Sequence, residues 1–283
     1  ERLIGAHMPV SSGLQSAITG GEQIGCTAVQ LFTANPKVWS TPPLEEADIA
    51  SFKATANASR VRFLCAHDSY LVNLAAPNPK VLGPSLKAFA NELTRADQLG
   101  IPWVVTHMGA HLNTGEDEGL ARLVSSVRRL LDESADKRSG IALETTAGQG
   151  TGLGYTFEQL ARVLDGVGPS ERLGICVDTC HIFAAGYDIR YEEGYEAAFG
   201  RIESLMGLDR IKVIHCNDAK KALGSRVDRH AHLGQGELGI EPFERLVNDR
   251  RLQHIPLIVE TPEAETMHQV NVALLWSLVR EEP

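Results

Sequence analysis

Six short apolar runs in this chain each end on a residue that can ligate a divalent metal ion. The runs are Arg62–His67, Trp103–His107, Ile141–Glu144, Ile175–Asp178, Ile211–His215 and Leu257–Glu260. The chain has only 36 acidic residues and 10 histidines among 283, so six such endings are not expected by chance. Imidazole nitrogens and carboxylate oxygens are the donors of catalytic Zn²⁺ sites, with Mn²⁺ as the competing ion. The pattern therefore predicts a metal centre.

Each run has the length and composition of a buried parallel strand, and the segments between the runs carry helical patterning. Two further runs, Leu3–His7 and Ala28–Thr33, bring the number of predicted strands to eight. We predict helices over residues 13–24, 44–58, 83–99, 117–136, 156–167, 192–206, 241–249 and 264–280. Eight strand–helix pairs favour an α/β fold, a (β/α)₈ TIM barrel that forms one domain over residues 1–283. All strand ends would then meet on the face where such barrels carry their chemistry.

Three more candidate ligands lie in segments that we predict to be loops, namely His181, Asp228 and His230. The complete set has five imidazoles and four carboxylates: His67, His107, Glu144, Asp178, His181, His215, Asp228, His230 and Glu260. At about three protein ligands for each open catalytic zinc, this set serves roughly three ions. Such a cluster would attract and polarise an anionic phosphodiester and generate a bound hydroxide near neutral pH.

The other histidines have less specific interpretations. A single histidine at a strand end is more often a hydrogen-bonded core residue than a ligand, but converging carboxylates and imidazoles stay desolvated and repel without cations. We leave open whether His7 is a ligand or a hydrogen-bond partner behind the ligands. His111 and His232 are expected behind the site or in solvent, and His254 and His268 on the surface.

Composition limits the compartment and the partners. A formal charge of −9 argues superficially against a nucleic-acid partner. That objection is weak, because four carboxylates belong to the predicted metal centre and binding depends on the local field. An odd number of cysteines without a CxxC spacing favours a reducing cytoplasm. No apolar run reaches the roughly 18 residues of a membrane span, so we predict no membrane partner. We also predict that the protein is a cytoplasmic monomer.

Two long segments, 34–43 and 216–240, leave strand carboxyl ends and are rich in glycine, proline and polar residues. Long loops on that rim are more often functional than structural. We predict DNA contacts from basic and aromatic residues in and beside these loops: Lys37, Trp39, Tyr70, Lys220, Arg226 and Arg229. The basic ones would position phosphates and the aromatic ones would wedge into a duplex. For each aromatic, packing on the rim is an equally good alternative.

In six segments spread along the whole chain, this sequence resembles the endonuclease IV family of apurinic/apyrimidinic (AP) endonucleases. The segments are Ile4–His7, His67–Ala75, Glu144–Gly150, Cys176–His181, His215–Lys220 and Gly224–His230. The resemblance implies a (β/α)₈ barrel with a trinuclear zinc site. It also implies an enzyme that cleaves double-stranded DNA 5′ to an abasic site, leaving a 3′-hydroxyl and a 5′-deoxyribose phosphate. Such enzymes also trim blocked 3′ ends.

The resemblance further implies how the ligands are shared among three zinc ions. The three sets are His67, His107 and Glu144; then Glu144, Asp178, His215 and Glu260; and finally His181, Asp228 and His230. Glu144 would bridge two ions, and the hydroxide between those ions would be the nucleophile. The third ion would stabilise the departing 3′-oxygen. The abasic nucleotide would be flipped out of the duplex, which is easy where no base stacks.

The chain departs from the family pattern at the rim. Lys37 stands where the family often has arginine, Met108 follows His107 in place of a proline, and Thr145 replaces a frequent asparagine. The main alternative is a sugar isomerase or epimerase on a related barrel, with a single metal held by Glu144, Asp178, His215 and Glu260. That alternative leaves the other five candidate ligands without a role. A noncatalytic, metal-dependent DNA-binding protein is the third class.

Overall fold

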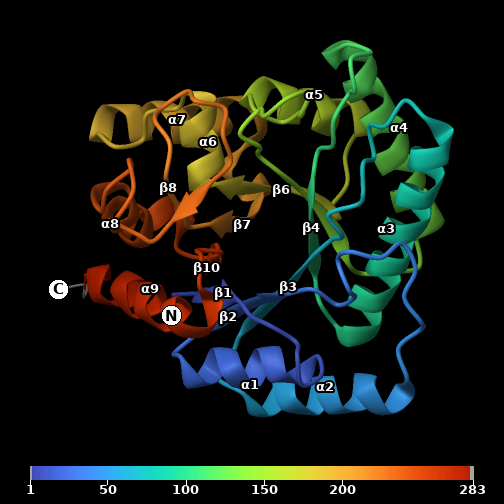
Figure 1. The fold of residues 1–283 in the computed structure, drawn as a ribbon, viewed down its shortest axis with the longest axis horizontal. Helices are drawn as coiled ribbons and strands as arrows, with labels where there is room; N and C mark the ends of the chain where they lie inside the picture. Colours follow the sequence, from blue (N-terminus) through green and yellow to red (C-terminus); the bar gives the residue numbers. More distant parts are fainter. Residues whose placement is uncertain (1, 281–283) are drawn as a thin grey trace.

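Eight parallel strands close into a barrel in the computed structural model, which describes residues 2–280 (Figure 1). The barrel strands are β1 (Ile4–His7), β2 (Ala28–Leu31), β3 (Phe63–His67), β4 (Trp103–His107), β5 (Gly140–Glu144), β6 (Leu173–Asp178), β7 (Ile211–His215) and β10 (Leu257–Val259). They are hydrogen-bonded in chain order, and β1 pairs with β10 to complete the ring. The predicted (β/α)₈ TIM barrel is confirmed.

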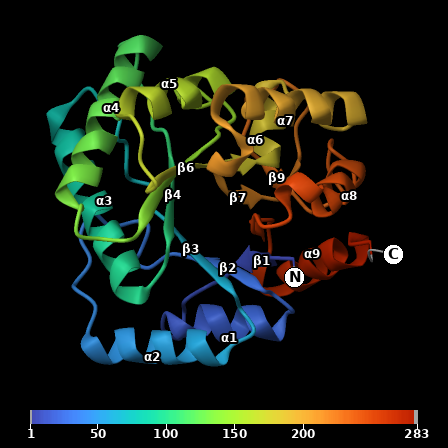
Figure 2. The same cartoon turned by 180° about the vertical axis from the view of Figure 1, so that it is seen from behind.

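Helices surround the strands on all sides, as the two opposite views show (Figures 1 and 2). They are α1 (Gln15–Gln23), α2 (Glu46–Ala58), α3 (Pro79–Leu99), α4 (Glu116–Glu133), α5 (Phe157–Val167), α6 (Thr179–Ala185), α7 (Glu192–Met206), α8 (Glu241–Asn248) and α9 (Ala264–Leu278). Within residues 2–280, no helix is both long and apolar enough to cross a membrane.

The predicted helices are present, with ends that differ from the prediction by up to four residues, and one further helix was not predicted. Helix α3 begins four residues earlier than predicted, because the Asn78 side chain accepts a hydrogen bond from Lys80 N and Pro79 opens the first turn. Helix α6 was not predicted, since its seven residues are too few to display a periodicity. The 216–240 segment, in turn, contains a short hairpin of β8 (Asp218–Ala219) and β9 (His230–Ala231).

Two apolar cores position the mouth of the barrel. One fills the space between strands and helices, with Phe52, Phe89 and Phe157 among its fully buried side chains. The other lies inside the barrel and contains one residue from each of seven strands: Ala28, Cys65, Val105, Ala142, Cys176, Val213 and Ile258. Close approach of the strands requires glycine at position 5, where a Cβ would lie 1.6 Å from the carbonyl oxygen of Ala28.

Candidate metal centre

The candidate ligands form the layer directly above the inner core. Side chains of a strand alternate between its two faces, so the residue two positions after an inner-core residue also points into the barrel. On six strands that residue is a predicted ligand: His67, His107, Glu144, Asp178, His215 and Glu260. On β1 and β2 the corresponding residues are His7 and Gln30. Every barrel strand thus contributes one polar side chain to a ring at the mouth.

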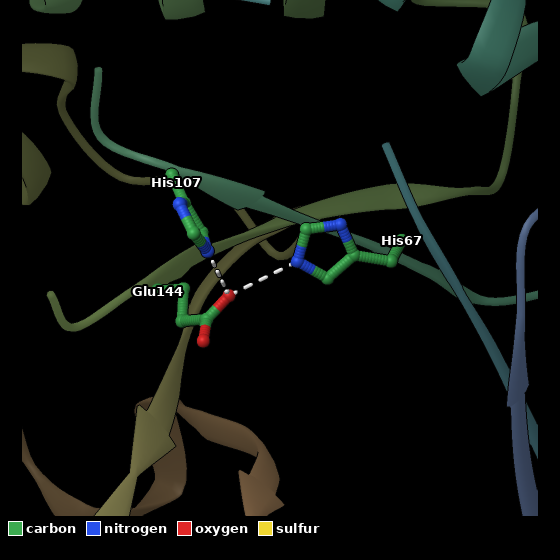
Figure 3. Close-up of side chains that lie close together, drawn as sticks. All are labelled: His67, His107 and Glu144. Carbon is green, nitrogen blue, oxygen red and sulfur yellow. Dashed lines mark hydrogen bonds and ion pairs between the residues drawn. The ribbon is translucent and has the colours of Figure 1, made fainter. Parts of the chain in front are cut away.

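The first group of side chains gathers at one oxygen of Glu144 (Figure 3). Oε2 of Glu144 lies 3.1 Å from Nε2 of His67 and 3.2 Å from Nε2 of His107. Strand pairing sets this arrangement, because His107 and Glu144 are register partners on β4 and β5. The His107 side chain is 45% exposed whereas the other two are buried, so the group opens to solvent on the His107 side.

The second group uses the other oxygen of the same glutamate. Oε1 of Glu144 lies 3.1 Å from Nδ1 of His215, which is also 3.1 Å from Oε2 of Glu260. Oδ2 of Asp178 completes the group at 3.8 Å from the same nitrogen. Because Glu144 presents one oxygen to each group, a single carboxylate faces two potential metal positions.

The third group lies at the outer side of Asp178. The two oxygens of Asp228 lie 3.1 Å from Nε2 of His181 and 3.3 Å from Nε2 of His230. Oδ2 of Asp178 is 3.6 Å from the same His230 nitrogen. Asp178 therefore faces the second and the third group, whereas the family resemblance implied a place in the second group alone. Cys180 is nearby, but burial raises the pKa of its thiol well above the usual range, so it stays a neutral thiol.

Hydrogen bonds on the far side of four imidazole rings decide which nitrogen carries the proton. Four oxygens each contact one ring nitrogen: Asp68 O with His67 Nδ1 (3.1 Å), Thr145 O with His181 Nδ1 (2.8 Å), Gln30 Oε1 with His215 Nε2 (2.8 Å) and Glu260 O with His230 Nδ1 (3.0 Å). These oxygens can only accept, so the contacted nitrogens are the N–H donors. The opposite nitrogens then direct lone pairs at the carboxylates.

Lone pairs facing carboxylate oxygens need a cation between them. Nε2 of His181 and Nε2 of His230 are buried and have no hydrogen-bond partner among residues 2–280, although each lies next to Asp228. Metal-ligating histidines are oriented by this kind of hydrogen bond from the opposite ring nitrogen. The donor set and its tautomers therefore fit divalent cations.

Protons are the alternative way to balance the same charge. Burial lowers the pKa of His67, but the hydrogen bond and charge of Glu144 outweigh burial and raise that pKa to about 9. Burial also lowers the pKa of His181, and the charges of Asp178 and Asp228 again outweigh it. Without cations, these imidazoles would hold protons near neutral pH.

Comparisons with known proteins agree with this geometry. The family model for xylose isomerase-like TIM barrels matches residues 21–277. A Chloroflexus aggregans protein named probable endonuclease 4 is 50% identical over 278 residues, covering 98% of this chain and 97% of that protein. The crystal structure of endonuclease IV from Thermus thermophilus matches with a TM-score of 0.87 and 32% identity, covering 98% of both chains. The chain belongs to the endonuclease IV family of AP endonucleases.

The barrel alone does not separate the endonuclease IV family from sugar-converting enzymes. A crystal structure of a D-tagatose 3-epimerase-like protein has a TM-score of 0.74 at 19% identity, covering 98% of this chain and 96% of that chain. That likeness shows a shared fold and nothing more. The group of His181, Asp228 and His230 would have no role in the single-metal alternative.

Two polar residues that contact the ligands of this endonuclease IV chain were not predicted from the sequence. Gln30 is fully buried; its amide nitrogen donates to Glu260 Oε1 (2.6 Å), and its oxygen accepts from His215. Asn217 donates to Asp178 Oδ2 (2.7 Å) and accepts from the backbone N–H of Glu260 (2.8 Å). Both residues hold carboxylates of the second group in place. A signal for Gln30 existed, since it is a polar residue at an inward position of an apolar strand.

The remaining histidines lie behind or beside the groups. His7 accepts from Gln30 at Nδ1 (3.0 Å), and burial lowers its pKa to about 3, so it is a neutral hydrogen-bond partner. The prediction of a surface position was wrong for His268. This residue of α9 is only 2% exposed, and its ring contacts the carbonyl oxygen of Thr261. His254 is exposed as predicted. His7 and His268 line a cavity of about 300 Å³ at the mouth, together with Phe32, Tyr70 and the candidate ligands other than Asp178 and His215.

His181 lies in a helix and not in a loop as predicted. Helix α6 begins directly after β6, and Oδ1 of Asp178 accepts a hydrogen bond from His181 N (2.9 Å) as its N-cap. Asp228, in turn, is held by the loop that follows β5, because its backbone N–H donates to Oε1 of Gln149 (3.2 Å). Local capping and loop contacts thus bring the third group to the strand-end ligands.

The predicted DNA-contacting residues all lie on loops at the mouth. Tyr70 and Trp39 are 67% and 43% exposed, and Tyr70 packs edge-on against Phe32 at 5.4 Å. Lys37, Lys220 and Arg229 are also exposed. The Arg226 side chain instead packs on an aromatic ring, with its guanidinium carbon 4.4 Å from the ring centre of Tyr155.

Proposed function

We propose that this chain is an AP endonuclease that hydrolyses the phosphodiester 5′ to abasic sites in double-stranded DNA, leaving a 3′-hydroxyl and a 5′-deoxyribose phosphate. We include trimming of blocked 3′ ends in the same proposal. Membership in the endonuclease IV family supports it. The observation that carries it is the pair of Glu144 oxygens, each facing a separate imidazole group beside a third group at Asp228.

Three Zn²⁺ ions per chain are the proposed cofactor, with Mn²⁺ possible at one position. His67, His107 and Glu144 would hold the first ion, and Glu144 would share the second with Asp178, His215 and Glu260. His181, Asp228 and His230 would hold the third, and Asp178 faces it as well. When bound, the cations would activate water as the nucleophile and neutralise the charge that develops on the phosphate.

The residues of the chain itself orient the DNA. Lys220 and Arg229, beside the third group, would pair with backbone phosphates and fix the register of the duplex. Trp39 and Tyr70 have exposed rings. These rings would stack on the bases that flank the gap left by the missing base. Arg226 would act mainly by holding its loop against Tyr155, with its charge still near the phosphates.

Metal analysis separates the proposal from the sugar isomerase. One ligand atom from each of Glu144, Asp178, His215 and Glu260 lies within 4.8 Å of the other three, so these four residues could serve one ion. About three zinc ions per purified chain would support the nuclease, and a single Mn²⁺ or Co²⁺ would support the isomerase. The decisive test is incubation of an end-labelled abasic duplex with the zinc-loaded protein and identification of the new termini. An uncut abasic duplex would refute the proposal, and a duplex with an intact base is the control.

Metal affinity should rise with pH. In the metal-free protein the pKa of His67 is about 9, so this imidazole holds a proton at neutral pH that zinc must displace. Affinity should therefore fall as pH drops below about 9, by about tenfold per pH unit for each displaced proton. Zinc titration calorimetry in buffers of different ionisation enthalpy, from pH 6 to 8, measures the released protons. Binding without proton release would contradict this prediction.

Replacing Tyr70 with alanine should weaken the preference for abasic over intact duplex by roughly tenfold or more, because stacking on an aromatic ring contributes about 1–3 kcal/mol. Zinc content should not change, since Tyr70 is 67% exposed and is not among the candidate ligands. Competition binding of the two duplexes measures the preference. Tyr191→Ala, at a ring 64% exposed on the loop before α7, is the matched control. Equal preference in the two variants would remove Tyr70 from the recognition surface.

A further inference from the structure

A buried arginine closes the base of the 34–43 loop. Arg95 projects from α3 and is only 5% exposed. Its Nη1 donates to the carbonyl of Pro42 (2.9 Å), and its Nη2 donates to the carbonyl of Thr33. One guanidinium therefore joins the residue before the loop to a residue near the end of the loop.

Thr33 links this arginine to a buried acid. The Thr33 hydroxyl accepts from Nε of Arg95 (3.1 Å) and donates to Oε1 of Glu92 (2.6 Å). Thr33 and Glu92 are 2% and 6% exposed, so the network is shielded from water. Charged hydrogen bonds between buried partners with fixed geometry are among the stronger polar contacts in proteins.

The loop is also fixed close to the metal groups. The Ser69 hydroxyl donates to the carbonyl of Pro36 (2.8 Å), which joins the loop to the segment that carries Tyr70. Loop residues Val38 and Trp39 line a small cavity together with His67. Both loop residues are nevertheless more than 40% exposed. A loop with exposed apolar groups thus has a rigid base.

We propose that Arg95 is a positioning residue that holds the 34–43 loop in the conformation that meets DNA. The inference rests on the proposed function, because it takes the loop to be part of the DNA-contacting surface. A loop that is already ordered loses less conformational entropy on binding, so its attachment increases affinity without any contact between Arg95 and DNA. Arg95 does not reach the metal groups, and its effect should be confined to the loop.

Arg95→Lys tests the proposal, because it keeps the positive charge beside Glu92 but one ammonium cannot span Thr33 and Pro42. The first readout is hydrogen exchange of the amides in residues 34–41, which needs no DNA. We expect exchange at least about tenfold faster there and unchanged in the barrel strands. The second readout is affinity for an abasic duplex, expected to fall roughly tenfold, with zinc content unchanged.

The control is Arg129→Lys, which changes an exposed arginine on α4 and should alter neither readout. If Arg95→Lys does not fold, Thr33→Val removes the linking hydroxyl and should shift both readouts in the same direction. Unchanged exchange in the loop would overturn the proposal, and so would faster exchange with unaltered affinity. If the wild-type protein neither binds nor cuts an abasic duplex, the proposed function fails, while the exchange data still report on the attachment of the loop.

Discussion

Replacing Glu144 with alanine is expected to abolish incision of an abasic duplex, with turnover at least about a thousandfold lower. The expectation follows from the two oxygens of this side chain, which lie 3.1 Å from His67 Nε2 and 3.1 Å from His215 Nδ1. Removing one carboxylate therefore dismantles two of the three proposed metal positions. Metal ions acting on a phosphoryl group supply several kcal/mol of stabilisation, and each 1.36 kcal/mol is about a tenfold change in rate.

Single-turnover incision and metal analysis on the same preparation measure this effect. Bound zinc should fall by about two ions per chain, leaving the group at Asp228. The fold should survive, because β5 is held by backbone pairing to β4 and β6. Circular dichroism checks the fold, and Glu118→Ala on the exposed face of α4 is the matched control. Incision by Glu144→Ala within tenfold of the wild-type rate would exclude a mechanism that depends on a shared carboxylate.

The barrel was predictable from the sequence because its signals are local and repeated. Each apolar run is a strand buried on both faces, and the runs are separated by segments long enough for a crossover helix. Convergence of the ligands followed from the topology alone, since parallel strands of one barrel end on the same face. No knowledge of side-chain packing was needed for either conclusion.

Predictions failed where tertiary packing decides the outcome. Strand β2 ends at Leu31 and not at Thr33, so its inward residue at the mouth is Gln30. The prediction considered only the last residue of each strand and not which face of the strand that residue occupies, so it missed Gln30. A polar residue at an inward position of an apolar strand was nevertheless visible in the sequence. His268 looked like a surface residue because α9 has polar residues on several sides, and only its packing on the mouth buries it.

The assignment of ligands to ions also exceeded what sequence alone determines. Spacing cannot reveal that Asp178 faces two groups, because that depends on where α6 and the β8–β9 segment place His181 and His230. Capping of α6 by Asp178 is equally invisible in a run of seven residues. One side chain thus has a structural oxygen and a metal-facing oxygen, and the two roles can be separated experimentally.

Asp178→Asn should retain helix α6 but lose metal at two positions. Oδ1 of Asp178 caps the helix through His181 N, and asparagine caps a helix about as well as aspartate. Oδ2 lies 3.8 Å from His215 Nδ1 and 3.6 Å from His230 Nε2, and there an amide N–H₂ would replace a negative oxygen. It would also face the amide of Asn217, which now donates to Oδ2. Incision should therefore fall by at least about a hundredfold.

A comparison with Asp178→Ala separates the two roles of the carboxylate. Alanine removes the cap as well, so in the metal-free state it should be less stable than Asp178→Asn by about 0.5–2 kcal/mol. Urea unfolding of both variants without metal measures this difference, and zinc titration measures the loss of binding that the two variants share. If Asp178→Asn bound three zinc ions with wild-type affinity, Asp178 would be only a helix cap. The second and third groups would then not depend on a common carboxylate.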